Sequence, residues 1–258
     1  MKVHPTAVIH EESSLGSDVE VGPYAVIEDH VVIGDHCRIM AGAHIKSYTT
    51  MGSYNTIHTG AVIGDLPQDL SFEGERSYVR IGDHNIFREH ATVHRGTKPE
   101  SVTTIGDHNF FMVNAHVAHN CSVGNHVIMV NNSSLAGHVE VQDSAMLSSL
   151  CLVHQFCRVG RHSLMRGAAR TSKDVPPFCI VDGVHTVRAL NLVGLQRAGF
   201  SEERIRSLKK SFSIVFRSGK RLSTALEEVE ATVPQTPDVQ HLLEFMRSSE
   251  RGVAFGKK

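Results

Sequence analysis

The feature that most constrains this chain is a six-residue period of apolar residues. Counting in sixes from Val3 to Ile63 gives an apolar residue at every position, and the same phase returns at Ile81 and from Ile105 to Met165. Only 41% of all residues are hydrophobic, so composition alone does not explain an unbroken run of this length. A period of six fits neither the 3.6-residue helix nor the two-residue alternation of a half-buried strand. The sequence therefore predicts a parallel β-helix, in which each hexad supplies one short strand and three hexads complete a coil.

A second, smaller residue tends to follow four positions after each apolar one, as Cys37 follows Ile33. We expect both to point into a narrow triangular prism whose coils stack about 4.8 Å apart. Cysteines fill this small position four times, where a thiol acts as a small hydrophobe; they are Cys37, Cys121, Cys151 and Cys157. The chain has five cysteines at no secreted spacing, which predicts reduced thiols.

The period breaks twice before it ends. The in-phase positions become Asp69 and Glu75, and later Pro99, which predicts loops at about 65–80 and 97–104. Loops on a rigid solenoid commonly carry function.

The hexads end at Asp174-Val175-Pro176-Pro177, and helical spacing follows. We therefore expect a β-helix over residues 1–176 and a C-terminal helical domain over 177–258 that covers the open end of the solenoid. Ser201 is the predicted N-cap of a helix that ends near Gly219. Further helical pieces are predicted near 224–231 and 237–247.

The overall charge argues against two classes of partner. Lys and Arg total 26 against 27 Asp and Glu, so no global field attracts nucleic acid or an anionic membrane. The first residues show no signal-peptide pattern, and no span of about 20 apolar residues is present. We expect a cytoplasmic protein without an integral membrane segment.

Histidine is concentrated in the predicted solenoid, with 16 of 18 before residue 177. Most of these residues are expected at exposed corners of the hexads, as in the units GDHN and GNHV. A group of four differs, because His116, His119, His138 and His154 lie within about two coils of each other in apolar or small surroundings. With 18 residues per coil, His119 lies beside Gly137 and Gln155, and Asn120 lies beside His138. This spacing is compatible with a functional pocket or with a polar ladder.

A zinc site is the alternative interpretation of clustered histidines. Gamma-class carbonic anhydrases carry zinc on the same scaffold, with ligands in a pattern of two coils followed by five residues. No trio of histidines has that spacing here, since position 131 is Asn and position 167 is Gly. We therefore expect neither a metal nor an organic cofactor.

Several segments resemble the UDP-N-acetylglucosamine acyltransferases, the first committed enzymes of lipid A biosynthesis. They are GDLPQDLSFEGE, IGDHNIFREHATVHRGT, NAHVAHNCSVGN, NNSSLAGHV, VHQFCRVG and KDVPPF. The similarity spans nearly the whole chain. It implies a homotrimer of left-handed β-helices with active sites between subunits. It also implies transfer of a (R)-3-hydroxyacyl chain from acyl carrier protein to the 3-position of the UDP-sugar.

The resemblance also assigns roles to individual residues. It implies that His119 is the general base and that the Gly137 N–H holds the oxyanion, with Asn120 next to the base. Residues matching sugar, diphosphate or uridine contacts are Asp69, His116, His138, His154, Gln155, Asn191 and Arg197. Gly167 matches a position that limits acyl-chain length, and His185 is expected near the end of that chain.

A strip of five cations precedes Asp174, and it consists of Arg158, Arg161, Arg166, Arg170 and Lys173. Residues 1–176 carry 13 basic against 18 acidic residues, so the strip is a local exception. We expect it to dock the strongly acidic acyl carrier protein.

The chain departs from the family pattern at four positions, which are Ser71, Asn120, Val193 and Ala198. The family usually has Asp where this chain has Asn120, and a neutral amide stabilises an imidazolium less than a carboxylate does. This departure leaves a 3-amino sugar, UDP-GlcNAc3N, as an alternative acceptor. A zinc-dependent hydratase and a non-catalytic nucleotide-sugar binder are the remaining alternatives.

Overall fold

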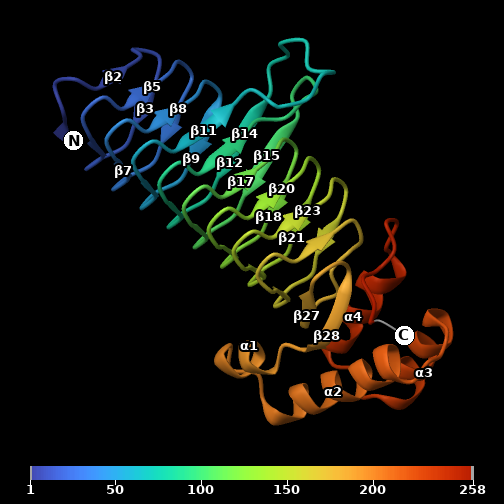
Figure 1. Ribbon diagram of the computed structural model, residues 1–258. Helices are drawn as coiled ribbons and strands as arrows, with labels where there is room; N and C mark the ends of the chain where they lie inside the picture. The colour runs from blue at the N-terminus through green and yellow to red at the C-terminus, as the bar shows by residue number, and fades with distance from the viewer. Residues whose placement is uncertain (1, 257–258) are drawn as a thin grey trace.

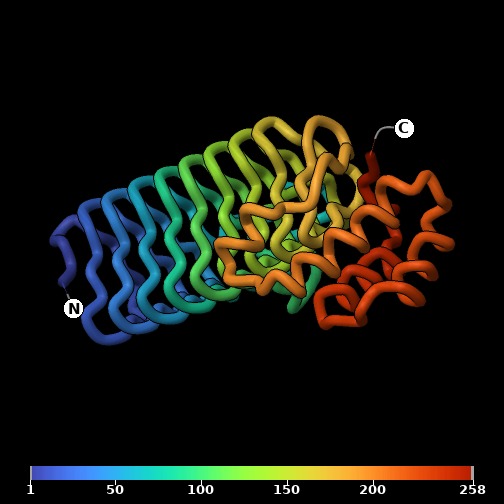
Figure 2. Tube along the Cα trace, turned by 90° about the horizontal axis from the view of Figure 1, so that it is seen from below, coloured from blue at the N-terminus to red at the C-terminus, as the bar shows by residue number. Residues whose placement is uncertain are grey.

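The structure is a computed structural model that describes residues 2–256. Short strands wind into a three-sided prism, and helices pack at its C-terminal end (Figure 1). Seen from below, the coils lie side by side along one axis, from the N-terminus to the helices (Figure 2). Each side of the prism is one sheet, with strands from successive coils paired in parallel.

The first sheet of the described residues has 11 strands: β1 (Lys2–Val3), β4 (Glu20–Val21), β7 (Arg38–Ile39), β10 (Thr56–Ile57), β13 (Ile86–Phe87), β16 (Phe110–Phe111), β19 (Ile128–Met129), β22 (Met146–Leu147), β25 (Leu164–Met165), β27 (Cys179–Asp182) and β28 (Thr186–Leu190). The second has nine: β2 (Val8–Ile9), β5 (Val26–Ile27), β8 (His44–Ile45), β11 (Val62–Asp65), β14 (Thr92–His94), β17 (His116–Val117), β20 (Ser134–Leu135), β23 (Leu152–Val153) and β26 (Arg170–Thr171). The third has eight: β3 (Ser14–Leu15), β6 (Val32–Ile33), β9 (Thr49–Met51), β12 (Tyr78–Ile81), β15 (Val102–Ile105), β18 (Ser122–Val123), β21 (Glu140–Val141) and β24 (Arg158–Val159).

The hexad pattern explains the core. In each strand of the regular coils one residue faces outward, and the next, at the in-phase apolar position, is buried; Ile33, Phe111 and Leu147 are each at most 2% exposed. The small residue four positions later is also buried, so each hexad contributes two side chains to the core. All five cysteines are buried and free, and burial raises the pKa of the Cys121 thiol to about 12. The thiols therefore pack as small hydrophobes.

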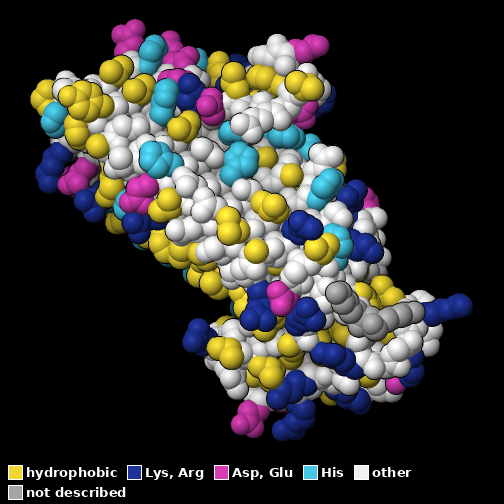
Figure 3. All heavy atoms as spheres, viewed as in Figure 1, with side chains coloured by type: hydrophobic (Ala, Val, Ile, Leu, Met, Phe, Trp, Pro, Cys, Tyr) yellow, Lys and Arg dark blue, Asp and Glu magenta, His cyan; other side chains and the backbone are white. Residues whose placement is uncertain are grey.

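The corners of the prism need a left-handed backbone conformation. Polar residues that tolerate positive φ occupy many of them, such as His84 (φ 58°), Asn114 (φ 57°) and Asn132 (φ 58°). Side chains at one corner stack along the prism, with ring centroids 4.7 Å apart for His84 and His108. Figure 3 shows histidines distributed along the face of the prism.

Two loops leave the coils; the first is shorter than expected, and the second begins and ends earlier in the chain than expected. The first spans residues 66–77, between β11 and β12, and the second spans 95–101, between β14 and β15. Expected loop residues at the edges belong to strands instead, because β12 pairs with β15 over four consecutive positions.

The end of the prism also differs from the expectation. Strand β27 continues the first sheet beyond residue 176 and pairs with β28, which is antiparallel. The helical part therefore begins with α1 (Leu192–Arg197), which the sequence analysis missed. It continues with α2 (Glu202–Arg217), α3 (Leu222–Thr232) and α4 (Pro237–Arg247), close to the expected helices. Ser201 caps α2 as expected, its hydroxyl accepting from the Arg204 N–H. Among the described residues, no helix has the length and apolarity needed to cross a membrane.

Candidate active site

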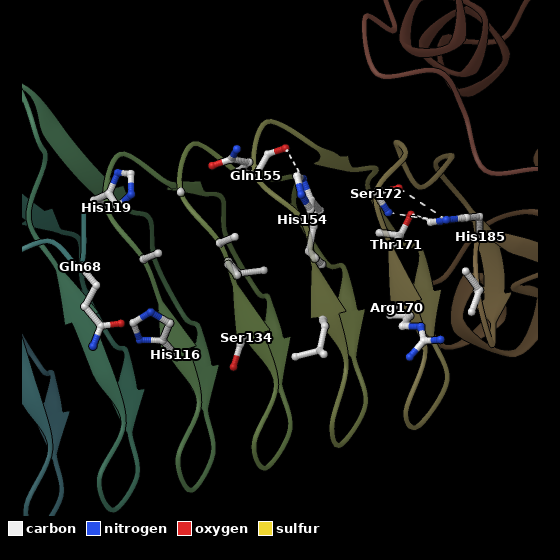
Figure 4. Close-up of a pocket in the computed structure, with 17 residues that line it drawn as sticks. Gln68, His116, His119, Ser134, His154, Gln155, Arg170, Thr171, Ser172 and His185 are labelled. Atoms are coloured by element: carbon white, nitrogen blue, oxygen red, sulfur yellow. Dashed lines mark hydrogen bonds between the residues drawn. The ribbon is translucent and has the colours of Figure 1, made fainter. Parts of the chain in front are cut away.

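A cavity of about 670 Å³ lies on the outer side of the second sheet. It extends across the coils from Gln68 and His119 at one end to Arg170 and His185 at the other (Figure 4). The outward residues His116, Ser134, Leu152 and Arg170 stand in register on neighbouring strands. The period of 18 residues thus places them in one row along the cavity.

Seven residues singled out from the sequence line this cavity. They are His116, His119, Gly137, His154, Gln155, Arg170 and His185. Asp69, Asn120 and His138 contact His119 from its other sides. The structure therefore brings the predicted base, its neighbours and most of the predicted sugar contacts into one place.

His119 is held in a defined orientation. Its Nδ1 lies 3.0 Å from Asn120 Oδ1, and that oxygen also accepts from the backbone N–H and the hydroxyl of Thr97. Because the Thr97 backbone N–H only donates, the oxygen of the Asn120 amide must face it and His119. Nδ1 then carries the hydrogen, which leaves the lone pair on Nε2 for a proton-abstracting role.

The negative charge near His119 comes from a different residue than in the family pattern. Asp69 Oδ2 lies 3.7 Å from His119 Nε2. Hydrogen bonds from the Ser71 N–H and hydroxyl hold the pKa of the Asp69 carboxyl below its usual range. Ser71 thus keeps Asp69 ionised, and Asp69 stabilises an imidazolium that Asn120 stabilises only weakly.

Gly137 approaches His119 so closely that no other residue fits. A Cβ at this position would lie 2.3 Å from His119 Cε1 and 2.5 Å from Nε2. Among the described residues, the Gly137 N–H donates to no backbone or side-chain acceptor. It is therefore a free donor directly beside the imidazole, which is the position an oxyanion would need.

Two other histidines of the site, His116 and His138, are neutral near pH 7. Burial, with small contributions from His94 and His119, lowers the pKa of His116 to about 4. Burial also lowers the pKa of His138. His116 Nδ1 bonds the Thr92 hydroxyl at 2.7 Å. Neutral imidazoles both donate and accept, which suits contacts with sugar hydroxyls.

We expect acidification from pH 7 to pH 5 to lower the free energy of unfolding. Burial lowers the pKa of seven histidines, which are His58, His94, His116, His138, His162, His185 and His241. Above pH 6.5 they are neutral in both states and contribute nothing. Below pH 6.5 these histidines bind protons in the unfolded chain but remain neutral in the folded chain, so the free energy of unfolding falls as the pH drops. The lowered pKa of His116 alone removes about 2 kcal/mol of this free energy at pH 5.

Chemical unfolding at both pH values measures this loss, and the variant His116→Asn should show a smaller difference between them. Carboxylates with lowered pKa values, such as Glu28 at about 2, lose their contribution only at lower pH. Equal stability of the wild-type chain at pH 7 and pH 5 would contradict the expectation.

Some residues singled out from the sequence lie outside the cavity of this chain. Gly167 does not line it, and a Cβ there would meet only Ser149 O at 3.7 Å. Asn191 caps α1 by accepting from the Gly194 N–H, and its amide nitrogen donates to His162 O. Arg197 lies at the end of α1 and does not line the cavity.

The five cations of the predicted docking strip have different environments. Arg158 is directed inward, where it pairs with buried Asp174 at 3.0 Å and donates to Phe245 O. It joins α4 to the prism and is not free to meet a partner protein. Arg161 lies over the Phe178 ring, and its Nε is buried. Arg166, Arg170 and Lys173 are exposed, and Arg170 also forms the far wall of the cavity.

Several lining residues were not predicted from the sequence. Gln68 lies in the quoted QDL motif, but only Asp69 was assigned from it. Ser134 and Leu152 follow His116 by one and two coils, so the spacing used for His119 would have found them. Thr171, Ser172 and Val184 line the end near His185 and had no such signal.

Three ligand atoms of His, Cys, Asp or Glu come together at one place in the described residues, which is formed by Glu12, Asp29 and His30. This group lies in the N-terminal coils, and its residues do not line the cavity. The histidines of the cavity form a row, not a trio converging on one point.

Comparison with known proteins finds two matching family models and relatives that are similar over nearly the whole chain. Residues 174–254 match the family described as UDP N-acetylglucosamine O-acyltransferase, domain 2, and residues 30–65 match the bacterial transferase hexapeptide family. A protein of Alkalilimnicola ehrlichii, an acyl-[acyl-carrier-protein]–UDP-N-acetylglucosamine O-acyltransferase, is 42% identical over 98% of both chains.

Solved structures agree in sequence and in shape. The UDP-N-acetylglucosamine acyltransferase of Bacteroides fragilis is 43% identical, with a TM-score of 0.94 over 97% of this chain and 99% of that one. The Campylobacter jejuni enzyme is 37% identical, with a TM-score of 0.93 over 99% of this chain and all of that one. These similarities confirm the left-handed parallel β-helix followed by helices. This chain therefore belongs to the UDP-N-acetylglucosamine O-acyltransferase family.

Proposed function

We propose that this enzyme transfers a (R)-3-hydroxyacyl chain from acyl carrier protein to the 3-hydroxyl of UDP-N-acetylglucosamine, the first step of lipid A biosynthesis. The observation that carries the proposal is the orientation of His119, whose Nε2 is free to accept a proton beside the free Gly137 N–H. We place the reaction in the cytoplasm and assign it no metal or organic cofactor.

The chemistry follows from this arrangement. His119 Nε2 takes the proton of the sugar 3-hydroxyl as its oxygen attacks the thioester carbonyl. The Gly137 N–H donates to the oxygen that becomes negative in the tetrahedral intermediate. When the intermediate collapses, the C–S bond breaks and the proton on His119 passes to the leaving thiolate. Asp69, 3.7 Å from Nε2, stabilises the imidazolium between these steps.

The lining residues divide into contacts for the substrate and for the acyl chain. His116, His154 and Gln155 in the wall, and His138 beside His119, offer donors and acceptors to the sugar and its diphosphate. His185 closes the far end, where its Nδ1 accepts from the Ser172 N–H at 3.1 Å. We assign this end, where Leu152, Val153 and Val184 contribute apolar side chains to the wall, to the acyl chain.

The acceptor in this proposal is the 3-hydroxyl sugar. The relatives named as O-acyltransferases favour it over the 3-amino analogue UDP-GlcNAc3N. The position of Asp69 supports this choice, because its carboxylate supplies, near His119 Nε2, the negative charge that Asn120 lacks.

A homotrimer would account for two further observations. An apolar stripe runs along the outer side of the first sheet, and it consists of Ile86, Phe110, Ile128, Met146 and Leu164 in register. Hydrophobic side chains are visible along this margin of the prism (Figure 3). Such a stripe favours coverage by another chain. A neighbouring subunit would also explain why Gly167, Asn191 and Arg197 lie outside the cavity of their own chain.

The exposed cations Arg166, Arg170 and Lys173 are the proposed docking site for acyl carrier protein. Arg170 lines the His185 end of the cavity, Lys173 lies near His185, and Lys and Arg side chains are also frequent around the C-terminal helices (Figure 3). An acidic carrier would be steered to this region, where its prosthetic arm could reach the cavity.

Mass spectrometry of the reaction product tests the proposed function. The purified enzyme is incubated with defined (R)-3-hydroxyacyl carrier proteins and with either UDP-N-acetylglucosamine or UDP-GlcNAc3N. We expect an ester of the 3-hydroxyl sugar, formed at least about 10-fold faster than the amide. Chelator treatment should leave the rate unchanged. A faster amide product would contradict the acceptor, and the absence of both products would contradict the transferase.

A further inference from the structure

A buried arginine lies at the base of the 66–77 loop. Arg95 directly follows strand β14 and is only 9% exposed. Its backbone N–H donates to Asp65 O at 3.0 Å, at the point where the loop leaves the prism. Its Nε is buried and has no hydrogen-bond partner within residues 2–256. Burying a guanidinium is costly, so its surroundings must stabilise the charge in another way.

Two aromatic rings provide that stabilisation. The guanidinium carbon of Arg95 lies 5.6 Å from the centroid of the Tyr48 ring and 5.7 Å from that of the Phe72 ring. Both distances are within the range of a cation–π interaction, and Arg is the cation best suited to aromatic faces. Tyr48 belongs to a coil of the prism, whereas Phe72 belongs to the loop. The Arg95 side chain thus connects the 66–77 loop to the coils of the prism.

The far end of the loop is bonded to the 95–101 loop, since the Ser77 hydroxyl donates to Gly96 O and the Glu100 N–H donates to Arg76 O. The middle of the loop is more exposed. Leu70 and Glu73 are exposed, and the side-chain bond of Ser71 is made to Asp69 within the loop itself. Yet this loop places Gln68 in the wall of the cavity and Asp69 at 3.7 Å from His119 Nε2. The position of these two groups therefore depends on what holds the loop to the prism.

We propose that Arg95 is a positioning residue, which fixes the 66–77 loop over the active site by joining the Phe72 ring to the Tyr48 ring. It acts through Asp69 and Gln68 and does not touch the substrate. The inference rests on the proposed function for its kinetic consequence, because Asp69 matters only if His119 is the base. The contact itself can be tested without any substrate.

Hydrogen exchange and steady-state kinetics on the full-length enzyme test this proposal. Phe72→Ala and Arg95→Met each remove one partner of the contact. We expect the loop amides to exchange about 10-fold faster and kcat/KM for UDP-N-acetylglucosamine to fall about 10-fold, because Gln68 leaves the cavity wall and Asp69 leaves His119. Phe72→Tyr keeps the ring and should restore both properties. Glu73→Ala, the neighbouring loop position with an exposed side chain, should match the wild type.

The proposal is overturned if Phe72→Ala leaves either the loop exchange or kcat/KM within twofold of the wild-type value. It is also overturned if Glu73→Ala changes both as much as Phe72→Ala does. If Arg95→Met does not fold, Phe72→Ala decides the test alone, because its ring lies on the loop. A wild-type enzyme that transfers no acyl chain contradicts the proposed function, but its loop exchange still tests the contact.

Discussion

Replacing His119 with Ala should lower kcat/KM by about 100- to 10,000-fold while the fold is retained. The imidazole is the group whose Nε2 is positioned to take the proton from the sugar hydroxyl, because Asn120 fixes the hydrogen on Nδ1. A methyl group neither accepts that proton nor returns it to the leaving thiolate. Initial rates with acyl carrier protein as donor measure the loss, and circular dichroism and thermal unfolding establish that the coils remain.

A second histidine variant serves as the control. His126 occupies an exposed corner of the same prism and stacks on His108, 5.0 Å between ring centroids. It lies between β18 and β19, not on the second sheet that carries the cavity, and it does not line the cavity. His126→Ala should keep the wild-type rate. Turnover of His119→Ala within about threefold of the wild type would remove His119 from the mechanism and favour a non-catalytic binding protein.

The fold could be predicted from the sequence because its rule is local. Each hexad carries its own core residues, as Ile33 and Cys37 show, and each coil repeats the same pattern 18 residues later. The same arithmetic placed His119 beside Gly137, and the structure confirms this neighbourhood. Wherever the chain remains in register, the sequence determines which side chains meet.

The features that were missed lie where the register ends. The path of the 66–77 loop brings Asp69 to His119, and the second loop brings Thr97 to Asn120; neither contact follows from a period of 18. Strand β27 extends the prism after the hexads stop, because pairing with β25 satisfies its backbone without the apolar pattern.

The hexad pattern also does not predict which charged side chains are paired inside the protein and which are exposed. Arg158 and Arg166 look equivalent in the sequence, as two cations of one strip. In the structure Arg158 pairs with buried Asp174, whereas Arg166 is exposed and lies 3.3 Å from Asp182. The C-terminal segment returns to the prism beside this pair, where Arg158 donates to Phe245 O and Ser249 donates to Asp174. A long-range contact of this kind has no counterpart in local spacing.

Replacing Gly137 with Ala should lower kcat by about 100-fold, although the change adds only a methyl group. The new Cβ would lie 2.3 Å from His119 Cε1, so the imidazole must move. The ring has little freedom to do so, because it is bonded to Asn120 and packs edge-on against His138 at 5.3 Å between centroids. The base and the oxyanion donor are therefore displaced together. Pre-steady-state measurements of acyl transfer should show the loss in the chemical step.

Two comparisons distinguish this steric effect from a general loss of stability. Gly256→Ala introduces the same methyl group where the nearest non-neighbouring atom is Val187 O at 3.7 Å, and it should leave the rate unchanged. The double variant His119→Ala/Gly137→Ala should be no slower than His119→Ala, because the clash disappears with the ring. Losses that multiply in the double variant would mean that Gly137 acts independently of His119, and the close approach of the two residues would then lose its assigned role.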